Sequence, residues 1–397
     1  MSPASFFLPK VLVQQLGAFM QKSKKDTLLL LSLAHGSNDI CWMMVPLLLP
    51  LIRRELHLTY TQSGLLLSCF SVAFSVFSIL SGHLGDIYKA RRVLSFGFLF
   101  TAAIFPLLLL SQSYFQIIAV LVLAAIGVSV FHPVGTALVS RNWQKGISFG
   151  FFEATGCLGI LIMTLLFSSL VTSLGWRLTS LILAAPSLPI GLAFLVSHLN
   201  LEHSDLMARP KVVPAKSKSL GLFYFARMAQ IFGGVAIGFF LPLFAVDVGG
   251  FAPEKASFFP LFTWLGAVPG MLVCGALSDH YSPLKIIFVL VLINILTIFA
   301  VTLPLPLLAI FVLLTALGFS GSGTWPAQNV WLSRVTSEKT RGRTFGRLIS
   351  LVNLAQAFSP LLFGFLADKW GLISAFRWAI LPIAVGALCL GRLMSKE

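Results

Sequence analysis

Long apolar stretches alternate with short polar connections along almost the whole chain. Runs such as TLLLLSLA (27–34) and VLVLAAIGV (120–128) carry no charged residue. A helix needs roughly 20 mainly apolar residues to cross the hydrocarbon core of a bilayer. The pattern predicts twelve membrane-spanning helices, at 27–52, 63–84, 92–111, 115–138, 145–172, 176–197, 220–247, 257–279, 284–303, 306–331, 343–367 and 372–392.

The composition supports this interpretation. Hydrophobic residues make up 57% of the 397 residues, charged residues only 10%, and the mean hydropathy is +0.93. Soluble domains carry about 25% charged residues, so the composition excludes an ordinary soluble protein. The stretch 1–26 lacks the apolar core and cleavage site of a signal peptide, and we expect a cytoplasmic tail there. The chain is therefore predicted to be an all-α membrane protein.

One long polar connection divides the predicted helices into two sets. Residues 198–219 contain charged residues, proline and serine, and they follow the sixth predicted span. We expect a cytoplasmic linker here. It would join an N-terminal six-helix half at 27–197 to a C-terminal half at 220–397.

Lysine and arginine are distributed unevenly between the two sides of the predicted helices. With the N-terminus in the cytoplasm, most of them fall in cytoplasmic segments such as 209–218 and 334–347. The outer segments hold only Arg53, Arg54, Arg177, Lys255, Lys369 and Arg377. Basic cytoplasmic loops are typical of membrane proteins, so we predict both termini in the cytoplasm. This bias explains the net charge of +15 through topology in the lipid bilayer, without a nucleic-acid partner.

The two predicted halves repeat each other in sequence. SGHLGDIYKARR (81–92) follows the second span, and CGALSDHYSPLK (274–285) follows the eighth. Their glycines, Gly82 and Gly275, are as far apart in the sequence as their aspartates are. The fourth and tenth spans also match, as AAIGVSVFHP and TALGFSGSGTWP. Two parallel repeats with a substrate site at their interface are one known plan of secondary transporters.

These residues carry a family resemblance. The stretch from Gly82 to Arg92 is similar to the loop motif after the second helix of the major facilitator superfamily, and the chain resembles that superfamily over essentially all its length. The resemblance implies that charges in this loop hold one closed state and separate when the halves move. The residues given this gating role are Gly82, Asp86, Lys89, Arg91, Arg92 and Asp279. The alternative is that these charges only set the topology.

A second resemblance concerns the subgroup. H-x-x-N-D at 35–39 and VFHP at 130–133 look like the fosmidomycin-resistance type of efflux protein, which implies export. GFFEATGCLG (150–159) has the glycines of the antiporter motif of the fifth helix and lacks its Gly-Pro pair. The arginine that proton antiporters often carry in the fourth helix is absent, and His132 lies in that helix instead.

Ionisable residues inside a membrane are costly, so they usually face a cavity and serve function. His35 and Asp39 are one helical turn apart in the first span, and Asn38 and Trp42 fall close to the same face. Glu153 lies in span five. We expect these side chains to line a water-accessible pathway, together with His132 of span four and Arg227 of span seven.

Distinct roles are predicted for these charges. Asp39 or Glu153 is predicted to carry a coupling proton, because burial favours the neutral carboxyl group and a nearby arginine favours the carboxylate. Arg227 stays protonated, which indicates an anionic substrate group or a carboxylate partner. His35, its repeat partner, could relay protons with His132. The alternative for each residue is a structural ion pair or a hydrogen bond between helices.

Amide and aromatic residues in the C-terminal half are further candidates for substrate contact. They lie in spans seven, ten and eleven: Gln230, Trp325, Gln328, Asn329, Asn353 and Gln356. Amides also join helices through hydrogen bonds, and tryptophan at a span end often belongs to the interfacial belt. Both alternatives remain open at this point.

The predicted function is secondary, proton-coupled transport of a small polar or anionic organic solute, with export favoured. Import of a metabolite, organic acid or siderophore-type metal chelate is the alternative, and a transporter-like sensor is a lesser one. A metal ion as direct substrate, held by His35, Asp39 and His132, is a further alternative. No G-x-x-x-x-G-K-[ST] or H-E-x-x-H motif occurs, so neither ATP-driven transport nor an intramembrane enzyme is predicted. We expect no cofactor and no resident metal, and a monomer in a bacterial inner membrane.

Overall fold

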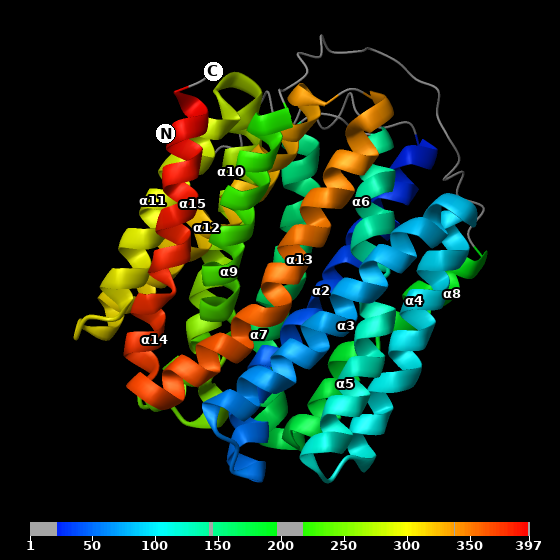
Figure 1. Ribbon diagram of the computed structural model, residues 1–397. Coiled ribbons are helices and arrows are strands. Elements are labelled where there is room, and N and C mark those ends of the chain that lie inside the picture. Colours follow the sequence, from blue (N-terminus) through cyan, green and yellow to red (C-terminus); the bar gives the residue numbers. More distant parts are fainter. Residues whose placement is uncertain (1–21, 143–145, 197–216, 337, 396–397) are drawn as a thin grey trace, which may run out of the picture.

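A computed structural model describes residues 22–142, 146–196, 217–336 and 338–395, and these residues form a bundle of long helices (Figure 1). We call residues 22–196 the N-terminal half. Its elements are α2 (Lys22–Leu56), α3 (Tyr60–Ile87), α4 (Ala90–Ile104), the 3-10 helix η1 (Phe105–Leu110), α5 (Tyr114–Val128), α6 (Phe131–Asn142), α7 (Gly146–Ala184) and α8 (Ser187–Val196).

We call residues 217–395 the C-terminal half. Its elements are α9 (Ser217–Asp247), the 3-10 helix η2 (Pro253–Lys255), α10 (Phe258–His280), α11 (Pro283–Val301), α12 (Leu307–Val335), α13 (Glu338–Trp370), α14 (Leu372–Trp378) and α15 (Ile380–Met394). The start of α2 and the end of α15 lie at the same end of the bundle (Figure 1). We call this the terminal end, and the opposite end the distal end. Most of the predicted linker 198–219 lies outside the described residues.

Eleven helical runs in the described residues are long and apolar enough to cross a membrane. The run Gly150–Val196 has 47 residues and contains both predicted spans five and six. A straight helix of that length would extend about 70 Å, more than twice the roughly 30 Å of a hydrocarbon core. The chain instead bends at Gly175, where φ is 74°, so this run makes two passes and the predicted twelve crossings are retained.

The bend at Gly175 has a counterpart in the other half. Gly371 joins α13 to α14 with φ 80° and ψ 159°, close to the φ 74° and ψ 164° of Gly175. Glycine adopts positive φ readily because it has no Cβ. The sequence repeat is therefore matched by the same backbone device before the last pass of each half.

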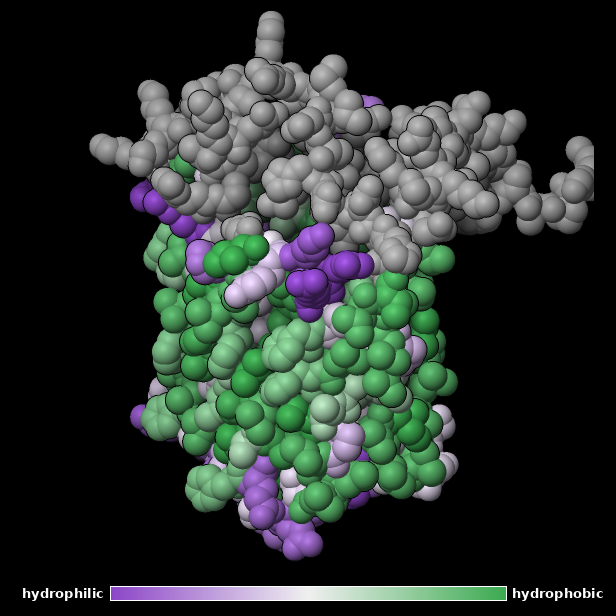
Figure 2. Space-filling view, turned by 90° about the vertical axis from the view of Figure 1, so that its right-hand side faces the viewer, coloured by the Kyte–Doolittle hydropathy of each residue, from purple (hydrophilic) through white to green (hydrophobic). Residues whose placement is uncertain are grey.

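Apolar side chains cover the outside of the bundle. Leu110, Phe115 and Leu308 are each at least 75% exposed. On the face shown in Figure 2, hydrophobic residues form a broad belt, and hydrophilic residues gather at the distal end and beside the grey region opposite. Such a surface is stable in lipid, which solvates apolar side chains and excludes polar ones. The chain is a multi-pass membrane protein.

Two helix pairs join the halves closely, α3 with α13 and α7 with α10. A Cβ atom on Gly64 of α3 would lie 2.3 Å from the carbonyl oxygen of Pro360, and one on Gly364 of α13 would lie 2.3 Å from that of Tyr60. At the α7–α10 contact, Gly150 approaches the Met271 carbonyl in the same way. Small residues allow the backbones of membrane helices to approach this closely.

Candidate functional site

The break between α5 and α6 places His132 at the start of a helix in the middle of a span. Pro133 has no N–H, so the carbonyl oxygen of Ser129 loses its usual helical partner. The Ser78 hydroxyl of α3 donates to that oxygen at 3.3 Å. The sequence predicted a span at 115–138, and the structure has one span at Tyr114–Val139. Within that span the helix is interrupted at Ser129 and Val130, before α6 begins.

His35, Asp39 and His132 form one cluster, which we call the His–Asp cluster. His35 Nε2 lies 3.3 Å from Asp39 Oδ2, and His132 Nε2 lies 3.0 Å from Asp39 Oδ1. His35 Nδ1 donates to the carbonyl oxygen of Phe152 at 2.8 Å. A carbonyl oxygen only accepts, so the proton on Nδ1 is fixed. His35 Nε2 and Asp39 Oδ2 therefore face each other at 3.3 Å, where a shared proton would remove the repulsion between two bare acceptors.

Helix α7 packs directly against this cluster. The ring of Phe152 stacks on His35 with centroids 4.3 Å apart. Glu153 is near enough to interact electrostatically with both histidines and with Asp39. Gly156 lies beside the cluster, where a Cβ atom would be 2.3 Å from Asp39 Oδ2. The absence of a side chain at this position lets α2 and α7 enclose the ion pairs.

Replacing Gly156 with alanine should disrupt the cluster. The added Cβ would also lie 2.8 Å from His35 Nε2, so the histidine and the carboxylate must separate or α7 must shift. We expect a loss of about 1–3 kcal/mol of stability, as for other overpacked sites, together with loss of transport. Thermal unfolding in detergent and uptake by vesicles measure the two effects.

Gly221→Ala is the matched control for this change. A Cβ at Gly221 would meet nothing within 4 Å, so the unfolding temperature and uptake should stay at wild-type values. Wild-type uptake by Gly156→Ala would show that transport does not require the close contact between α7 and the cluster.

The polar cluster of the C-terminal half is built around Arg227. Its Nε donates to Gln328 Oε1 at 2.6 Å, and its Nη1 donates to Gln230 Oε1. The guanidinium lies 5.4 Å from the ring centroid of Trp325. Arg227 is completely buried, and it forms no ion pair within the part of the chain that the structure describes. A buried cation without a counter-ion is costly unless a ligand supplies the negative charge.

The two clusters occupy matching places in the sequence repeat. His132-Pro133 corresponds to Trp325-Pro326, and His35 corresponds to Arg227. The structure brings both pairs together: the rings of His35 and His132 are 5.3 Å apart, and Arg227 lies 5.4 Å from the Trp325 ring. The same scaffold therefore holds two imidazole rings in one half and a guanidinium beside an indole ring in the other.

A cavity of about 350 Å³ lies between the two halves. Most of the residues predicted as site residues line it, namely Asp39, Trp42, His132, Glu153, Gln230, Trp325, Gln328, Asn329, Asn353 and Gln356. His35, Asn38 and Arg227 do not line the cavity and are buried behind its wall. This corrects the expectation that these three side chains face the pathway themselves. Two of them contact residues that do line the cavity: His35 lies 3.3 Å from Asp39, and Arg227 donates to Gln328.

Some lining residues were missed in the sequence. Cys157 and Asn294 both line the cavity, and Asn294 donates to the Ser320 hydroxyl at 3.2 Å. The available signal was weak: Asn294 is a single amide within the apolar run IIFVLVLINILTIF. Aromatic rings also contribute much of the wall, including Phe74 and Trp264. The cavity is thus mainly apolar, with polar groups concentrated at the two clusters.

The His–Asp cluster also has the residue types of a metal site. One ligand atom from each of His35, Asp39 and His132 lies within 4.8 Å of the others. The contacts of 3.0 and 3.3 Å are equally those of ion pairs. Because a metal-binding histidine usually donates its other ring N–H to a carbonyl or carboxylate, the bond from His35 Nδ1 to Phe152 fits a metal ligand as well as a proton-binding residue.

Ion pairs between the halves close the cavity at the distal end. Arg53 of α2 contacts Asp247 of α9 at 2.8 Å, and the Tyr60 hydroxyl donates to the same carboxylate at 2.6 Å. Arg54 contacts Glu254 at 2.5 Å. Each of these contacts joins one half to the other. We use the term distal seal for these contacts together with those of Asp368, which are described next.

Asp368 near the end of α13 completes the distal seal. Its carboxylate accepts hydrogen bonds from the backbone N–H groups of Tyr60 at 3.0 Å and Thr61 at 2.7 Å, at the start of α3. The first N–H groups of a helix have no helical partner, and the helix dipole favours an anion there. A carboxylate of one half thus caps a helix of the other. Sequence analysis missed this role, because an acidic residue at a span end has no distinctive pattern.

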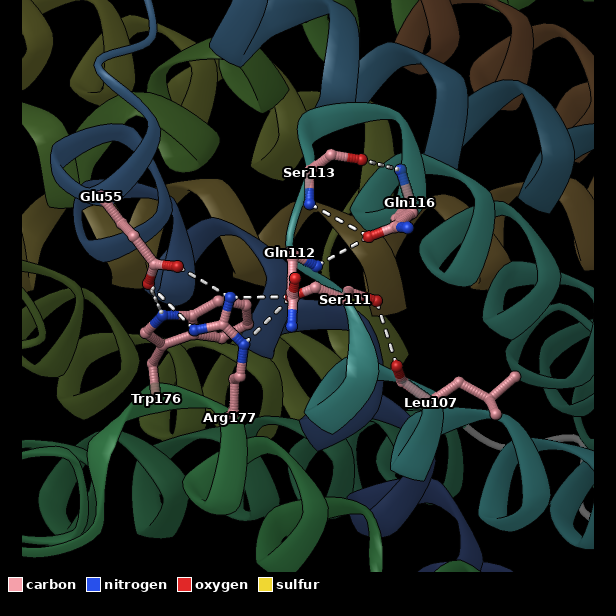
Figure 3. A network of polar contacts seen from close by, with 8 residues as sticks. All are labelled: Glu55, Leu107, Ser111, Gln112, Ser113, Gln116, Trp176 and Arg177. Carbon is pink, nitrogen blue, oxygen red and sulfur yellow. Dashed lines mark hydrogen bonds and ion pairs between the residues drawn. The ribbon is translucent and has the colours of Figure 1, made fainter.

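A separate polar network at the distal end stays within the N-terminal half (Figure 3). Arg177, just after the bend at Gly175, forms a two-point ion pair with Glu55 at 2.7 and 3.0 Å and donates to the carbonyl oxygen of Ser111. Trp176 donates to the same carboxylate at 2.7 Å. This network fixes the bend of α7 against α2 without touching the C-terminal half.

The predicted gating loop lies at the terminal end, between α3 and α4. Gly82 approaches Pro133, with 3.5 Å between an added Cβ and the proline side chain. Lys89 is the N-cap residue of α4, and Arg91 and Arg92 lie in its first turn.

The side chain of Asp86 lies outside the described residues. Asp279, its counterpart, is in the last turn of α10. The gating role of these residues stays a prediction.

The sequence matches a known family of membrane proteins over most of its length. The model of the Major Facilitator Superfamily matches residues 31–315 and 304–396. A probable L-galactonate transporter of Escherichia coli (strain K12) is 23% identical over 382 residues, covering 85% of this chain and 82% of that protein. The fosmidomycin resistance protein of the same strain is 25% identical over 264 residues, covering 63% of this chain and 64% of that protein.

A solved structure has the same fold. The bacterial homologue of the human lysosomal transporter Spinster, in an inward-facing and occupied conformation, aligns with a TM-score of 0.77 at 16% identity. The alignment covers 95% of this chain and 98% of that one. With the family match across both halves, the chain belongs to the major facilitator superfamily: it is a secondary transporter and not an enzyme.

Proposed function

We propose that this transporter couples proton movement to the transport of a small organic anion through the cavity between its halves. The observation that carries the proposal is Arg227, a buried cation without a counter-ion among the described residues, next to the cavity wall. An organic anion in the cavity would supply the missing charge. The similarity to a probable L-galactonate transporter supports an anionic substrate.

The His–Asp cluster is the proposed proton site. Asp39 lines the cavity and contacts both His35 and His132. A proton shared by His35 Nε2 and Asp39 can leave toward the cavity through His132, which also lines it. Glu153 faces the same cluster and offers a second carboxylate for the proton.

Placing the proton site and the anion site in different halves suggests how they are coupled. Moving an uncompensated charge through the membrane interior is unfavourable. When a proton is bound in the N-terminal half and an anion in the C-terminal half, their charges offset each other. The net charge in the closed cavity is then smaller than when only the proton or only the anion is bound. Alternating access would then proceed most readily with both sites occupied or both empty.

The positive-inside pattern supports a cytoplasmic location of the terminal end. The distal seal would then face outward, and the conformation is inward-facing on this assignment. We infer a bacterial inner-membrane location with both termini inside, and a monomer as the working unit because one chain encloses the cavity. Export is the direction that the subgroup resemblance favours, whereas the symport described above would carry the anion inward under an inward proton gradient. Import of a metabolite, organic acid or metal chelate is the alternative.

Purified protein in vesicles with an imposed pH gradient tests the coupling. Radiolabelled L-galactonate, D-glucuronate and benzoate serve as probes, and empty vesicles are the control. We expect at least one anion to accumulate when the gradient is present and to equilibrate when an ionophore collapses it. Equal, gradient-independent movement of every probe would contradict proton coupling. Absence of any transport would contradict the choice of small organic anions.

Metabolite profiling of a deletion strain and its complemented parent tests the direction. A compound retained inside the deletion strain means export, and a compound left unused in the medium means import. The same experiment identifies the solute by mass. An identical profile in both strains under several growth conditions would favour a transporter-like sensor over a transporter of metabolites.

Weakening the distal seal should open the cavity at that end. Asp368→Ala removes the acceptor of the Tyr60 and Thr61 N–H groups. Loss of charge-assisted hydrogen bonds worth about 1.5–3 kcal/mol should shift the conformational equilibrium by at least about 10-fold. The measurement is labelling of Cys157, which lines the cavity, by an impermeant maleimide in a variant with no other cysteine.

Glu55→Ala is the control for Asp368→Ala. It breaks the ion pair with Arg177 at the same end but within one half, so labelling of Cys157 from the distal side should not rise. Equal labelling in both variants would show that Asp368 does not hold the halves together.

A further inference from the structure

The contacts of Arg227 identify the oxygen atom of two glutamine amides at the cavity wall. An arginine side chain has only N–H donors, so the groups it contacts on Gln230 and Gln328 must be the amide oxygens. The amide nitrogen of each glutamine is the opposite end of the planar group. Both glutamines line the cavity, and neither amide nitrogen donates a hydrogen bond within the described ranges.

Arg227 itself is screened from the cavity. It is completely buried and does not line the cavity, whereas Trp325 does line it and lies over the guanidinium at 5.4 Å. A ligand in the cavity would therefore meet the amide nitrogens and the indole ring before it meets the cation. The positive charge still acts on the ligand, because it polarises the amides and is weakly screened in a low dielectric.

We propose that Gln230 and Gln328 form an oxyanion-binding subsite, in which Arg227 is a positioning residue rather than a ligand contact. The amide nitrogens donate to a carboxylate, and the apolar body of the same molecule lies against the aromatic wall at Trp325. This inference rests on the proposed transport of an organic anion. It names a carboxylate with a planar or apolar body as the preferred substrate class.

Two glutamine variants separate this subsite from direct contact with Arg227. Gln230→Met and Gln328→Met keep the side-chain length and remove the amide. If the amides bind the anion, each variant should weaken binding of benzoate by about 10-fold or more, the scale of a hydrogen bond to a charged group. If Arg227 binds directly, removal of a covering amide should leave affinity unchanged or raise it, and the proposal is overturned.

Gln112→Met provides the control for removing a glutamine amide. Gln112 is exposed at the distal end, does not line the cavity and does not contact Arg227. We expect its effect on benzoate affinity to be smaller than about threefold. An equal loss in all three variants would overturn the subsite, since it would indicate an effect that does not depend on the position of the amide at the cavity.

A fourth variant excludes misfolding as the cause of weak binding. Gln328→Glu gives Arg227 a carboxylate partner and should raise the unfolding temperature, yet it places an acceptor where the anion needs a donor. Stability should rise while benzoate affinity falls. The dissociation constants are measured by calorimetry on the full-length protein in nanodiscs, with benzoate and L-galactonate as the two probes.

The wild-type protein distinguishes failure of this inference from failure of the proposed function. If the wild type binds neither probe and transports no carboxylate, the choice of an organic anion is wrong and the subsite is rejected with it. If the wild type binds benzoate and the two methionine variants bind it equally well, the transport proposal stands and only the subsite is rejected. Tighter binding of L-galactonate than of benzoate would overturn the preference for an apolar body.

Discussion

Asp39→Asn should reduce proton-driven accumulation of the anion to the level of protein-free vesicles. Asparagine has nearly the same shape, but it cannot bind or release a proton. The proton shared between His35 Nε2 and Asp39 would then have no carboxylate to move to, and His132 would lose its ion-pair partner at 3.0 Å. The measurement is uptake of the labelled anion with and without an imposed pH gradient.

The binding of the anion provides the internal control for Asp39→Asn. Arg227 and its glutamines lie in the other half and do not contact Asp39 in the described structure. Anion affinity and exchange of internal for external anion should therefore persist. Uphill accumulation by Asp39→Asn at the wild-type level would remove Asp39 as the proton carrier.

Glu153→Gln then decides which carboxylate titrates. Glu153 interacts with the His–Asp cluster only through space, whereas Asp39 contacts both histidines. We expect Glu153→Gln to slow accumulation and Asp39→Asn to abolish it. The reverse order would move the proton site to Glu153. Wild-type accumulation by both variants would contradict a carboxylate proton site in this cavity.

The proximity of His35 and Asp39 could be predicted from the sequence, for a physical reason. Ionisable side chains are rare in membrane spans because they are costly there, so His35 and Asp39 stood out one helical turn apart. Helical periodicity then placed both on one face. The position of the bend between spans five and six was also predictable, since the apolar runs end close to Gly175.

The sequence could not predict how Arg227 relates to the cavity. Hydrophobic patterning identifies a charged residue within a span, but it does not tell whether the side chain lines the cavity or lies one layer behind it. The place of the Arg227 side chain depends on Gln328, which is far away in the sequence. Gln328 Oε1 accepts a hydrogen bond from Arg227 Nε at 2.6 Å. The distal seal was missed for a related reason, since Asp247 and Asp368 lie at helix ends where acidic residues are ordinary.

Equivalent positions of the two halves carry side chains with different chemistry. His35 and Arg227 occupy equivalent positions, and each is buried behind the cavity wall against a ring from the fourth helix of its half. Imidazole exchanges protons near neutral pH, whereas guanidinium keeps its charge. Differences at several repeated positions, His35 against Arg227 and His132 against Trp325 among them, therefore separate the proposed proton site from the proposed anion site.

Arg227→Met should abolish anion binding with little loss of stability. Removing the guanidinium takes away the only charge that favours an anion at this wall, and loss of a buried charge of this kind weakens binding by about 2–5 kcal/mol, or at least about 30-fold. The folded protein also loses an unpaired buried cation, which offsets the loss of two hydrogen bonds to Gln230 and Gln328. Calorimetry with benzoate and thermal unfolding measure the two quantities.

Two further variants, Arg377→Met and Arg227→Lys, test whether the loss of anion binding is specific to the Arg227 guanidinium. Arg377 donates to the Thr302 hydroxyl at 3.0 Å at the distal end, so its removal should lower the unfolding temperature and leave anion affinity unchanged. Arg227→Lys keeps the charge, but a single ammonium group cannot hold two amides in a fixed plane, and we expect an intermediate affinity. Wild-type affinity in Arg227→Met would mean that the anion is held elsewhere in the cavity, and that the buried cation serves only the packing of α9 against α12.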